Sequence, residues 1–221
     1  MNVRQRDRLA EYLGGYHHFL EGLAEYRLDR QDHAREAFRG LTTNTIKDPV
    51  LAYTSAMTLT KLGQSEVAAQ MLGRLENTFS NRLEFWLQLQ AAAYDSRQFD
   101  LLLAATRKAY EINPRKIEYR NNYAAALLES RQDSGKAIQL TIDALREAPR
   151  AFETRVNHAM ALLQNARADD AEPILRDLDD ERTDSQRDTI VSMAWFEYYQ
   201  GKGDTNRAVE AASRVQERLL L

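Results

Sequence analysis

The sequence predicts an all-α fold in which about six antiparallel helix-turn-helix units stack on one another. Three observations predict it. A pattern of two short amphipathic helices recurs about every 34 residues. Pro49, Pro114 and Pro149 lie 65 and 35 residues apart, which is close to two periods and one. A small residue also stands early in most second helices, where two helix backbones approach most closely.

The small residues mark the same point of each unit. They are Ala34, Ala68, Ala137, Ala171 and Ala208, with Leu102 at the equivalent point of the third unit. A short polar segment precedes each of them, such as LDRQDHA at the first and LGQSEVA at the second. Connections this short force the two helices of a unit to run antiparallel.

The chain is therefore divided into repeats within a single domain, residues 1–221. The expected repeats are 15–48, 49–82, 83–116, 117–151, 152–186 and 189–221. Residues 1–14 are expected to form a capping helix that ends at Gly14 and Gly15, because a terminal repeat otherwise leaves its packing face in water.

One proline tests the helical interpretation. Pro173 lies in the segment AEPILRDL, where a proline in the middle of a helix would cost about 3 kcal/mol. If Asp170 is the N-cap, Pro173 falls in the first turn, whose amides have no partner within the helix. We therefore expect Asp170 as the N-cap and an ordinary proline early in the helix, in preference to a functional kink.

The repeats resemble those of the tetratricopeptide repeat family, whose pattern is Trp, two residues, Leu-Gly, two residues, Tyr, then Ala, three residues, Phe, then Pro. The third unit matches it at Trp86, Leu89, Ala109 and Pro114, and departs from it at Gln90, Ala93, Leu102 and Thr106. The first unit supplies Gly22, Ala34 and Phe38, and the fourth supplies Ala137, Ala144 and Pro149. No single unit is complete, but six degenerate copies in phase extend over residues 16–221. The resemblance implies a right-handed superhelical solenoid, of bacterial origin by its 24 arginines against 6 lysines.

Each first helix carries two apolar stripes. In the third unit, Trp86, Leu89 and Ala93 share the face that the family uses for packing, whereas Leu87, Ala91 and Tyr94 share the face that the resemblance places on the inner, concave wall. An apolar concave strip with polar points is typical of a receptor for a peptide or a helix. The predicted binding residues are Phe19, Leu23, Tyr26, Tyr53, Met57, Leu87, Tyr94, Tyr119, Asn122, Asn157 and Met160.

Two observations limit this interpretation. First helices have neighbours on both sides, so their inner apolar residues can also pack against one another, and the sequence does not separate the two cases. Some family members hold a C-terminal carboxylate with paired lysines, an arginine and asparagines. On the first three units, those positions hold Phe19, Leu23, Thr54, Glu84 and Gln88. The positive charge is missing, so binding of such tails is not expected.

Composition excludes several classes of protein. There is no cysteine, which removes disulfides, thiolate metal sites and cysteine nucleophiles. The net charge is −3 and no part is strongly basic, so nucleic-acid binding is not expected. No apolar run approaches the roughly 20 residues of a membrane span, and the start MNVRQRDRLAEYLGG does not resemble a secretory signal. The expected location is the cytoplasm. A processed precursor or a domain of a longer chain would leave the same sequence, so the periplasm stays open.

The sequence offers no catalytic, metal or cofactor motif. His17 and His18 are adjacent and point about 100° apart on a helix, and His158 lies at a packing position, so no metal site is expected. The acidic run DLDDERTDS at 177–185 lacks the central glycine and the twelfth-position glutamate of a calcium loop. No nucleophile elbow, phosphate loop or dinucleotide fingerprint occurs. We do not expect an enzyme or a bound cofactor.

Two functions from different classes remain. The first is a protein-interaction scaffold that binds a peptide or helical segment of a partner protein in an apolar concave groove. The second is a structural, self-assembling module, a homodimer for example, whose groove is covered by another copy. A regulatory domain of a larger protein is a third alternative.

Overall fold

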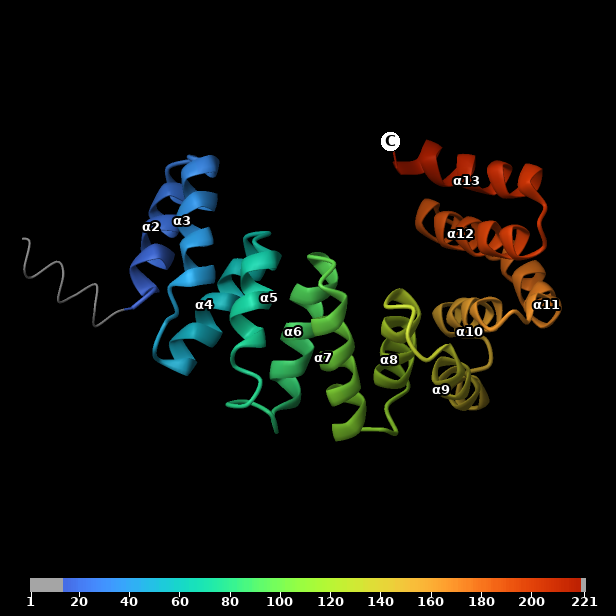
Figure 1. The fold of residues 1–221 in the computed structure, drawn as a ribbon, viewed down its shortest axis with the longest axis horizontal. Coiled ribbons are helices and arrows are strands. Elements are labelled where there is room, and N and C mark those ends of the chain that lie inside the picture. Colours follow the sequence, from blue (N-terminus) through green and yellow to red (C-terminus); the bar gives the residue numbers. More distant parts are fainter. Residues whose placement is uncertain (1–13, 220–221) are drawn as a thin grey trace, which may run out of the picture. The chain divides into compact units, whose positions relative to one another are not determined.

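The computed structural model describes residues 14–219, with side chains up to residue 215, and in this range it contains twelve helices and no strand (Figure 1). The predicted all-α fold is confirmed. The helices are α2 (Tyr16–Arg27), α3 (Gln31–Thr43), α4 (Pro49–Lys61), α5 (Ser65–Gly73), α6 (Leu83–Asp95), α7 (Phe99–Ile112), α8 (Ile117–Glu129), α9 (Ser134–Glu147), α10 (Phe152–Gln164), α11 (Ala168–Asp179), α12 (Ser185–Gly201) and α13 (Thr205–Leu219). The predicted capping helix at residues 1–14 lies outside the described residues, apart from Gly14.

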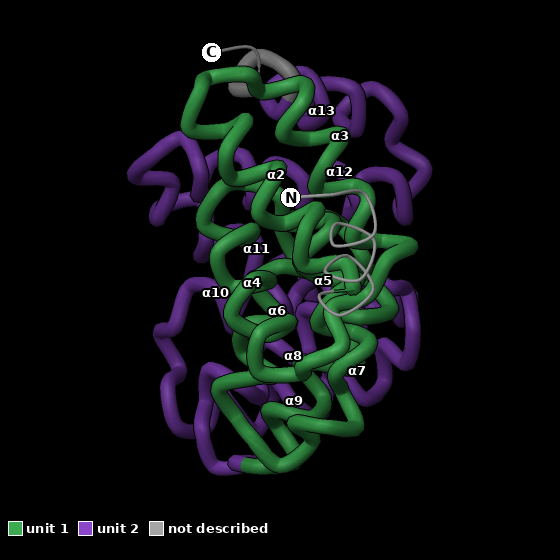
Figure 2. Tube along the Cα trace, turned by 90° about the vertical axis from the view of Figure 1, so that its left-hand side faces the viewer, with its two compact units in different colours: residues 1–112 green, residues 113–221 purple. Residues whose placement is uncertain are grey.

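The chain forms two compact units, Met1–Ile112 and Asn113–Leu221, which Figure 2 shows in separate colours. Unit 1 contains the helix pairs α2/α3, α4/α5 and α6/α7, with α5 packed against both α3 and α6. Unit 2 contains α8/α9, α10/α11 and α12/α13, with α10 packed against α8 and α9, and α12 against α10 and α11. Each unit is thus a stack of three helical hairpins.

The same turn closes all six hairpins of the described chain. The second residue after each first helix has a left-handed backbone: Asp29 (φ 58°), Gly63 (72°), Arg97 (55°), Arg131 (49°), Ala166 (56°) and Gly203 (73°). The next amide then donates to the carbonyl five residues earlier, as in the bond from Arg30 N to Glu25 O at 3.0 Å. This is the Schellman arrangement, which satisfies carbonyls at the end of the first helix. It also reverses the chain within three residues in five of the hairpins, because only the turn before α9 is one residue longer. The turn before α9 contains a further left-handed residue, Asp133 (35°).

The small-residue positions lie in the core, as predicted. Ala68, Ala137 and Ala171 have no exposed surface, and Ala34, Leu102 and Ala208 are buried as well. The packing stripe of α6 is also confirmed, since Trp86, Leu89 and Ala93 are all buried. Trp86 donates its indole N–H to the carbonyl of Ser80 at 2.8 Å, which satisfies its polar atom inside the core.

The expected position of Pro173 is wrong. Helix α11 begins at Ala168, with Arg167 as the N-cap, so Pro173 lies inside the helix at its sixth position. The left-handed turn at Ala166 sets this start in the same register as in the other hairpins. Asp169 and Asp170 then fall in the first turn, where carboxylates interact favourably with the free amides, and Arg167 pairs with Asp170 at 2.7 Å.

The start of α12 also depends on a cap. Asp184 accepts the amide of Arg187 at 2.8 Å and starts the helix at Ser185. The sixth predicted repeat range begins at residue 189, inside this helix. No helix in residues 14–219 is both long and apolar enough to cross a membrane.

The half-buried histidines include His18 and His158, whose pKa values are shifted. His158 on α10 has Nδ1 at 2.9 Å from Thr141 Oγ1 on α9. Burial lowers the pKa of His158, with a further contribution from Arg167. Burial likewise lowers the pKa of His18, assisted by the adjacent His17 and opposed by Glu21. Within the described residues, no group of three or more His, Asp or Glu side chains is placed to hold a metal ion.

These pKa shifts predict that acid weakens the fold. Because both histidines have a lower pKa in the folded chain than the ordinary 6.5, the unfolded chain binds more protons as the pH falls through 6.5. The free energy of unfolding should therefore fall between about pH 7.5 and pH 5.5. Urea unfolding at both pH values checks this, and the fall should be smaller in His158→Gln. An identical fall in wild type and His158→Gln would show that His158 contributes nothing to it.

Candidate functional site

The predicted stripe on α2 is partly used for packing. Phe19 is 6% exposed, and its ring centroid lies 6.5 Å from that of Phe38 on α3 and 5.5 Å from that of Tyr16. It therefore belongs to the core of the first hairpin. Leu23 and Tyr26 follow it along the helix and are half-buried, so part of each side chain faces solvent.

On α4, the stripe connects two hairpins. The ring of half-buried Tyr53 lies 5.4 Å from Phe79 and 6.1 Å from Phe85, which is the first aromatic residue of α6. Burial raises the pKa of the Tyr53 hydroxyl, and the carboxylate of Glu84 adds to the effect. Met57, one turn further on, is half-buried. Tyr53 therefore holds α4 against α6, whereas Met57 keeps accessible surface.

The stripe is most accessible on α6. Leu87 is half-buried, and Tyr94 at the other end of the helix is 67% exposed. Both lie beside the buried packing stripe that contains Trp86. We call the accessible part of this surface the unit 1 stripe. It consists of Leu23, Tyr26, Met57, Leu87 and Tyr94.

In unit 2, the predicted residues are half-buried and more polar. They are Tyr119, Asn122, Asn157 and Met160. Asn157 is already engaged, because its amide donates to Asn121 Oδ1 on α8 at 3.0 Å. In the same unit, Arg131 in the α8–α9 turn lies 3.4 Å from Glu197 on α12, so an ion pair joins the first and third hairpins. The bond between Asn157 and Asn121 joins the first helices α10 and α8, whereas the Arg131–Glu197 pair is largely exposed and contributes little.

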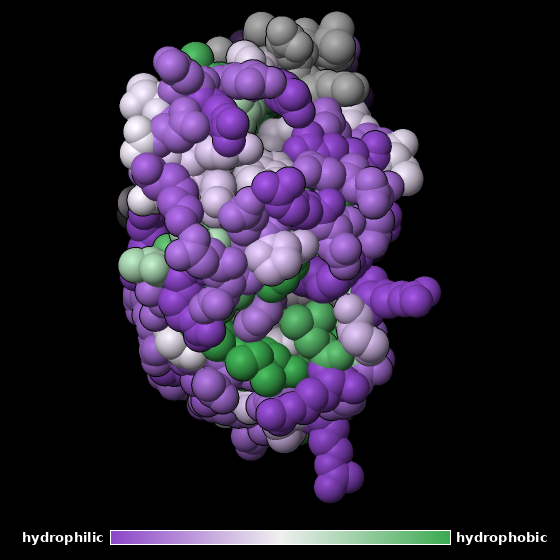
Figure 3. Space-filling model, turned by 90° about the vertical axis from the view of Figure 1, so that its right-hand side faces the viewer, coloured by the Kyte–Doolittle hydropathy of each residue, from purple (hydrophilic) through white to green (hydrophobic). Residues whose placement is uncertain are grey.

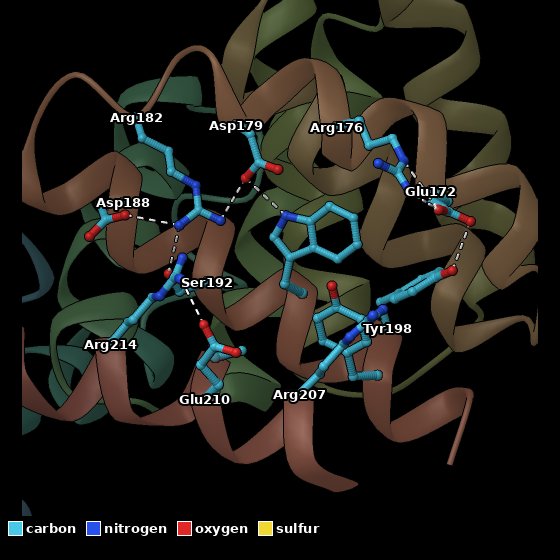
Figure 4. A pocket seen from close by; sticks show the side chains of 13 residues that line it. Glu172, Arg176, Asp179, Arg182, Asp188, Ser192, Tyr198, Arg207, Glu210 and Arg214 are labelled. Carbon is cyan, nitrogen blue, oxygen red and sulfur yellow. Dashed lines mark hydrogen bonds and ion pairs between the residues drawn. The ribbon is translucent and has the colours of Figure 1, made fainter. Parts of the chain in front are cut away.

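A groove that the sequence analysis did not predict lies in unit 2, between α11 and α13 and over α12 (Figure 4). Its volume is about 690 Å³. We call it the α11–α13 groove. Its lining residues are Glu172, Arg176, Asp179, Arg182, Asp188, Ser192, Trp195, Tyr198, Tyr199, Arg207, Glu210, Ala211 and Arg214.

Aromatic residues of α12 form the floor of this groove. Trp195 stacks on Tyr199 with centroids 5.3 Å apart, and meets Tyr198 edge-on at 5.2 Å. Both buried polar tips have partners on α11: Trp195 Nε1 donates to Asp179 Oδ1 at 3.0 Å, and the Tyr198 hydroxyl donates to Glu172 Oε2 at 2.8 Å. Burial and this bond to Glu172 raise the pKa of Tyr198. The floor is therefore fixed against α11.

One end of the groove is fixed by Arg182 in the α11–α12 loop. Its guanidinium lies 2.6 Å from Asp179 Oδ1 and 3.0 Å from Asp188 Oδ1, and donates to Ser192 Oγ at 3.2 Å. Figure 4 shows Arg182 between these two carboxylates. Only 15% of the Arg182 side chain and 18% of the Asp188 side chain are exposed. This is the most enclosed ion pair of the groove.

The walls of the groove carry alternating charges at helical spacing. Wall α11 presents Glu172, Arg176 and Asp179, and wall α13 presents Arg207, Glu210 and Arg214. Neighbours on the same helix neutralise one another, as in Arg176–Glu172 at 2.6 Å and Arg214–Glu210 at 3.0 Å. The guanidinium of Arg207 also lies 5.7 Å from the ring centre of Tyr199. The groove is therefore aromatic below and charged, but nearly neutral, at its edges.

The surrounding surface is mostly polar. The side of the molecule seen in Figure 3 is largely hydrophilic, and its most extended hydrophobic patch lies low in the view. On such a surface, contiguous groups of exposed apolar side chains are informative, because they mark candidate interaction sites.

The helical-hairpin stack defines the class of the protein as an α-helical repeat protein. No protein-family model matches the sequence, and no curated protein matches it. Several solved structures are similar to the chain. A tetratricopeptide repeat protein from Parabacteroides merdae is 14% identical, with a TM-score of 0.58 over 96% of this chain and 82% of that one. The chain therefore has the fold of the tetratricopeptide repeat proteins.

MamA structures show the same fold. The RS-1 double mutant is 15% identical, with a TM-score of 0.54 over 77% of this chain and 93% of that one. MamA of MSR-1 is 16% identical, with a TM-score of 0.51 over 77% of this chain and 95% of that one.

The sequence did contain a signal for the α11–α13 groove. Charges alternate at residues 172, 176 and 179 and again at 207, 210 and 214, on two consecutive second helices. The aromatic run WFEYY at 195–199 lies on the first helix between them. The predicted binding residues lie on first helices, whereas the α11–α13 groove also involves second helices.

Proposed function

We propose that the chain is a protein-interaction scaffold that binds an extended or helical segment of a partner protein along the unit 1 stripe. One observation carries the proposal. Leu87 and Tyr94 leave apolar surface accessible on α6 after Trp86 and Leu89 have satisfied the hairpin core. The proposed role is binding, without catalysis.

The chemistry of the stripe selects the partner. Tyrosine contributes a large rigid ring at a low entropic cost, and such residues dominate the affinity of many interfaces. Leucine and methionine beside it accept apolar side chains at the three- and four-residue spacing of an amphipathic helix. A segment with two or three apolar anchors on one face would match Leu87, Met57 and Tyr94.

The α11–α13 groove supports a second binding surface for the same class of partner. Its exposed guanidinium and carboxylate groups alternate along both walls, so a segment with alternating charges would find an opposite charge at each level. Ion pairs at an exposed rim are screened by salt, whereas apolar contacts are not. Binding in this groove should weaken as salt increases, and binding at the unit 1 stripe should not.

The test begins with proteins captured by the wild-type chain from an extract. Their affinities are then measured with purified wild type, Tyr94→Glu, Leu87→Glu and the control Ile112→Glu, which lies exposed on the second helix of the same hairpin. We expect the two stripe variants to bind at least about 10-fold more weakly, because the partner would bury an unpaired carboxylate. Ile112→Glu should bind normally.

Circular dichroism and thermal unfolding decide whether a loss of binding is specific. Tyr94→Glu should keep wild-type helicity and stability, because Tyr94 is largely exposed. Equal binding by wild type, Tyr94→Glu and Leu87→Glu would exclude the unit 1 stripe as the site. A loss with Leu87→Glu that accompanies melting would instead assign Leu87 to the core.

A further inference from the structure

An apolar groove lies between α12 and α13, on faces of these helices that differ from those lining the α11–α13 groove. We call it the α12–α13 groove, and its volume is about 720 Å³. Met193 is 51% exposed and Val209 is 64% exposed, while Phe196 is half-buried. The groove is lined by Met193, Phe196, Gln200, Gly203, Thr205, Ala208, Val209, Ala212, Ser213 and Val215.

A comparison of α13 with α11, the second helix of the preceding hairpin, shows that the α12–α13 groove lacks two charges that α11 carries. Aligning Ala171 with Ala208 places Val209 where α11 has Glu172, and Ser213 where it has Arg176. On α11 that position is polar: Glu172 accepts the Tyr198 hydroxyl and pairs with Arg176. On α13 both charges are replaced by uncharged side chains. The groove therefore favours an apolar occupant and offers a tyrosine or a tryptophan no acidic acceptor at this position.

The groove also carries both halves of a self-complementary surface. Met193 and Val209 project from it, and the small residues Gly203, Ala208 and Ala212 line the hollow beside them. Projecting side chains of one copy can fill the hollow of another when a two-fold axis relates the two faces. Within the described part of the chain, no charged residue lines the groove, so two copies would meet without like-charge repulsion.

The face is large enough for a modest dimer. Helices of 17 and 15 residues, side by side, present an area of about 25 Å by 20 Å. Corrugation by side chains raises the accessible area toward the roughly 800 Å² per partner of a standard interface. We propose that a second copy of this chain covers the α12–α13 groove through the same face. This proposal goes beyond partner binding at the unit 1 stripe and does not depend on it.

Two valine substitutions test the proposal with matched chemistry. Val209→Glu places a carboxylate in the α12–α13 groove, and Val50→Glu places one on α4, where Val50 is 61% exposed, close to the 64% of Val209. Light scattering or sedimentation follows the mass from about 1 μM to 200 μM. Wild type and Val50→Glu should rise from the monomer mass of 25.4 kDa toward twice that value. Val209→Glu should dimerise at least about 100-fold more weakly, because two unpaired carboxylates would be buried.

Three results would overturn the proposal. They are a wild type that stays monomeric over the whole range, a Val209→Glu chain that dimerises as wild type does, and a Val50→Glu chain that loses the dimer equally. A monomeric wild type that still captures an apolar helix in this groove would assign the groove to another protein.

Cross-linking gives an answer even if Val209→Glu folds poorly. The chain contains no cysteine, so a single introduced thiol reacts alone. Val209→Cys should form a covalent dimer with a short bismaleimide, and Val50→Cys at the same concentration should not. Equal yields from the two variants would show that collisions, not a dimer, bring the thiols together.

Discussion

Replacing Arg182 with alanine is expected to lower the free energy of unfolding by about 3 kcal/mol. The guanidinium joins Asp179 and Asp188 at 2.6 and 3.0 Å, and its side chain is only 15% exposed. Removing Arg182 would take the guanidinium away from Asp188, whose side chain is only 18% exposed, and the loss of such an enclosed contact costs more than the loss of an exposed one. Asp188 and Asp179 would also repel each other across the loop that starts α12.

Arg214→Ala is the matched control for this change. Arg214 lines the same groove and pairs with Glu210 at 3.0 Å, but its side chain is 52% exposed. Exposed pairs contribute little, so the unfolding free energy should stay within about 0.5 kcal/mol of wild type. Urea unfolding of the three proteins at neutral pH measures the difference. Equal losses for Arg182→Ala and Arg214→Ala would mean that enclosure does not distinguish the two arginines.

Replacing Gly22 with alanine is expected to cost about 3 kcal/mol of stability. A Cβ atom at this position would lie 2.3 Å from Cε1 and 2.4 Å from Cδ1 of Phe38. Phe38 has no exposed surface and is enclosed by the first hairpin, so its ring has nowhere to move. The overlap exceeds the gain of up to about 1 kcal/mol that alanine normally gives in a helix.

A second substitution tests the cause. Phe38→Leu removes the ring atoms that the new methyl group would meet, so the cost of Gly22→Ala should be much smaller in that background. Gly201→Ala is the control, because among the described residues no neighbouring atom lies within 4 Å of the place its methyl group would take, and its backbone is helical. It should leave stability unchanged or raise it slightly. A cost for Gly22→Ala that persists in the Phe38→Leu background would exclude steric overlap as its cause.

The repeat pattern could be predicted because small side chains recur at the buried contacts between helices. Buried alanines such as Ala68 and Ala137 recur where two helices approach closely, although Leu102 takes this place in the third unit. The left-handed residues of the turns were harder to predict from the sequence. Gly63 and Gly203 indicate left-handed positions, but Asp29, Arg97, Arg131 and Ala166 take the same conformation without glycine. Their turns are imposed by the hydrogen bonds of the hairpin, not by the local residue.

The same limit explains the error at Pro173. A local rule placed the proline in a first turn, whereas the register of the hairpin placed it five residues into α11. The accessibility of the candidate binding residues was harder to predict than the position of Pro173. Helical spacing puts Phe19, Tyr53 and Tyr94 on equivalent faces, yet Phe19 is buried, Tyr53 packs against Phe79, and Tyr94 is exposed. Exposure depends on what the neighbouring hairpin supplies, which spacing within one helix does not encode.

The hydrogen bond shared by the six hairpin turns has a consequence for how the chain acquires its structure. Each hairpin is closed by bonds between residues five positions apart, and its two helices meet within about 30 residues of sequence. Little loop entropy is lost in such closures, so formation should be fast and should proceed outward from any hairpin. Hairpins can therefore add to the stack one after another as the chain leaves the ribosome, each covering the apolar face of the one before it.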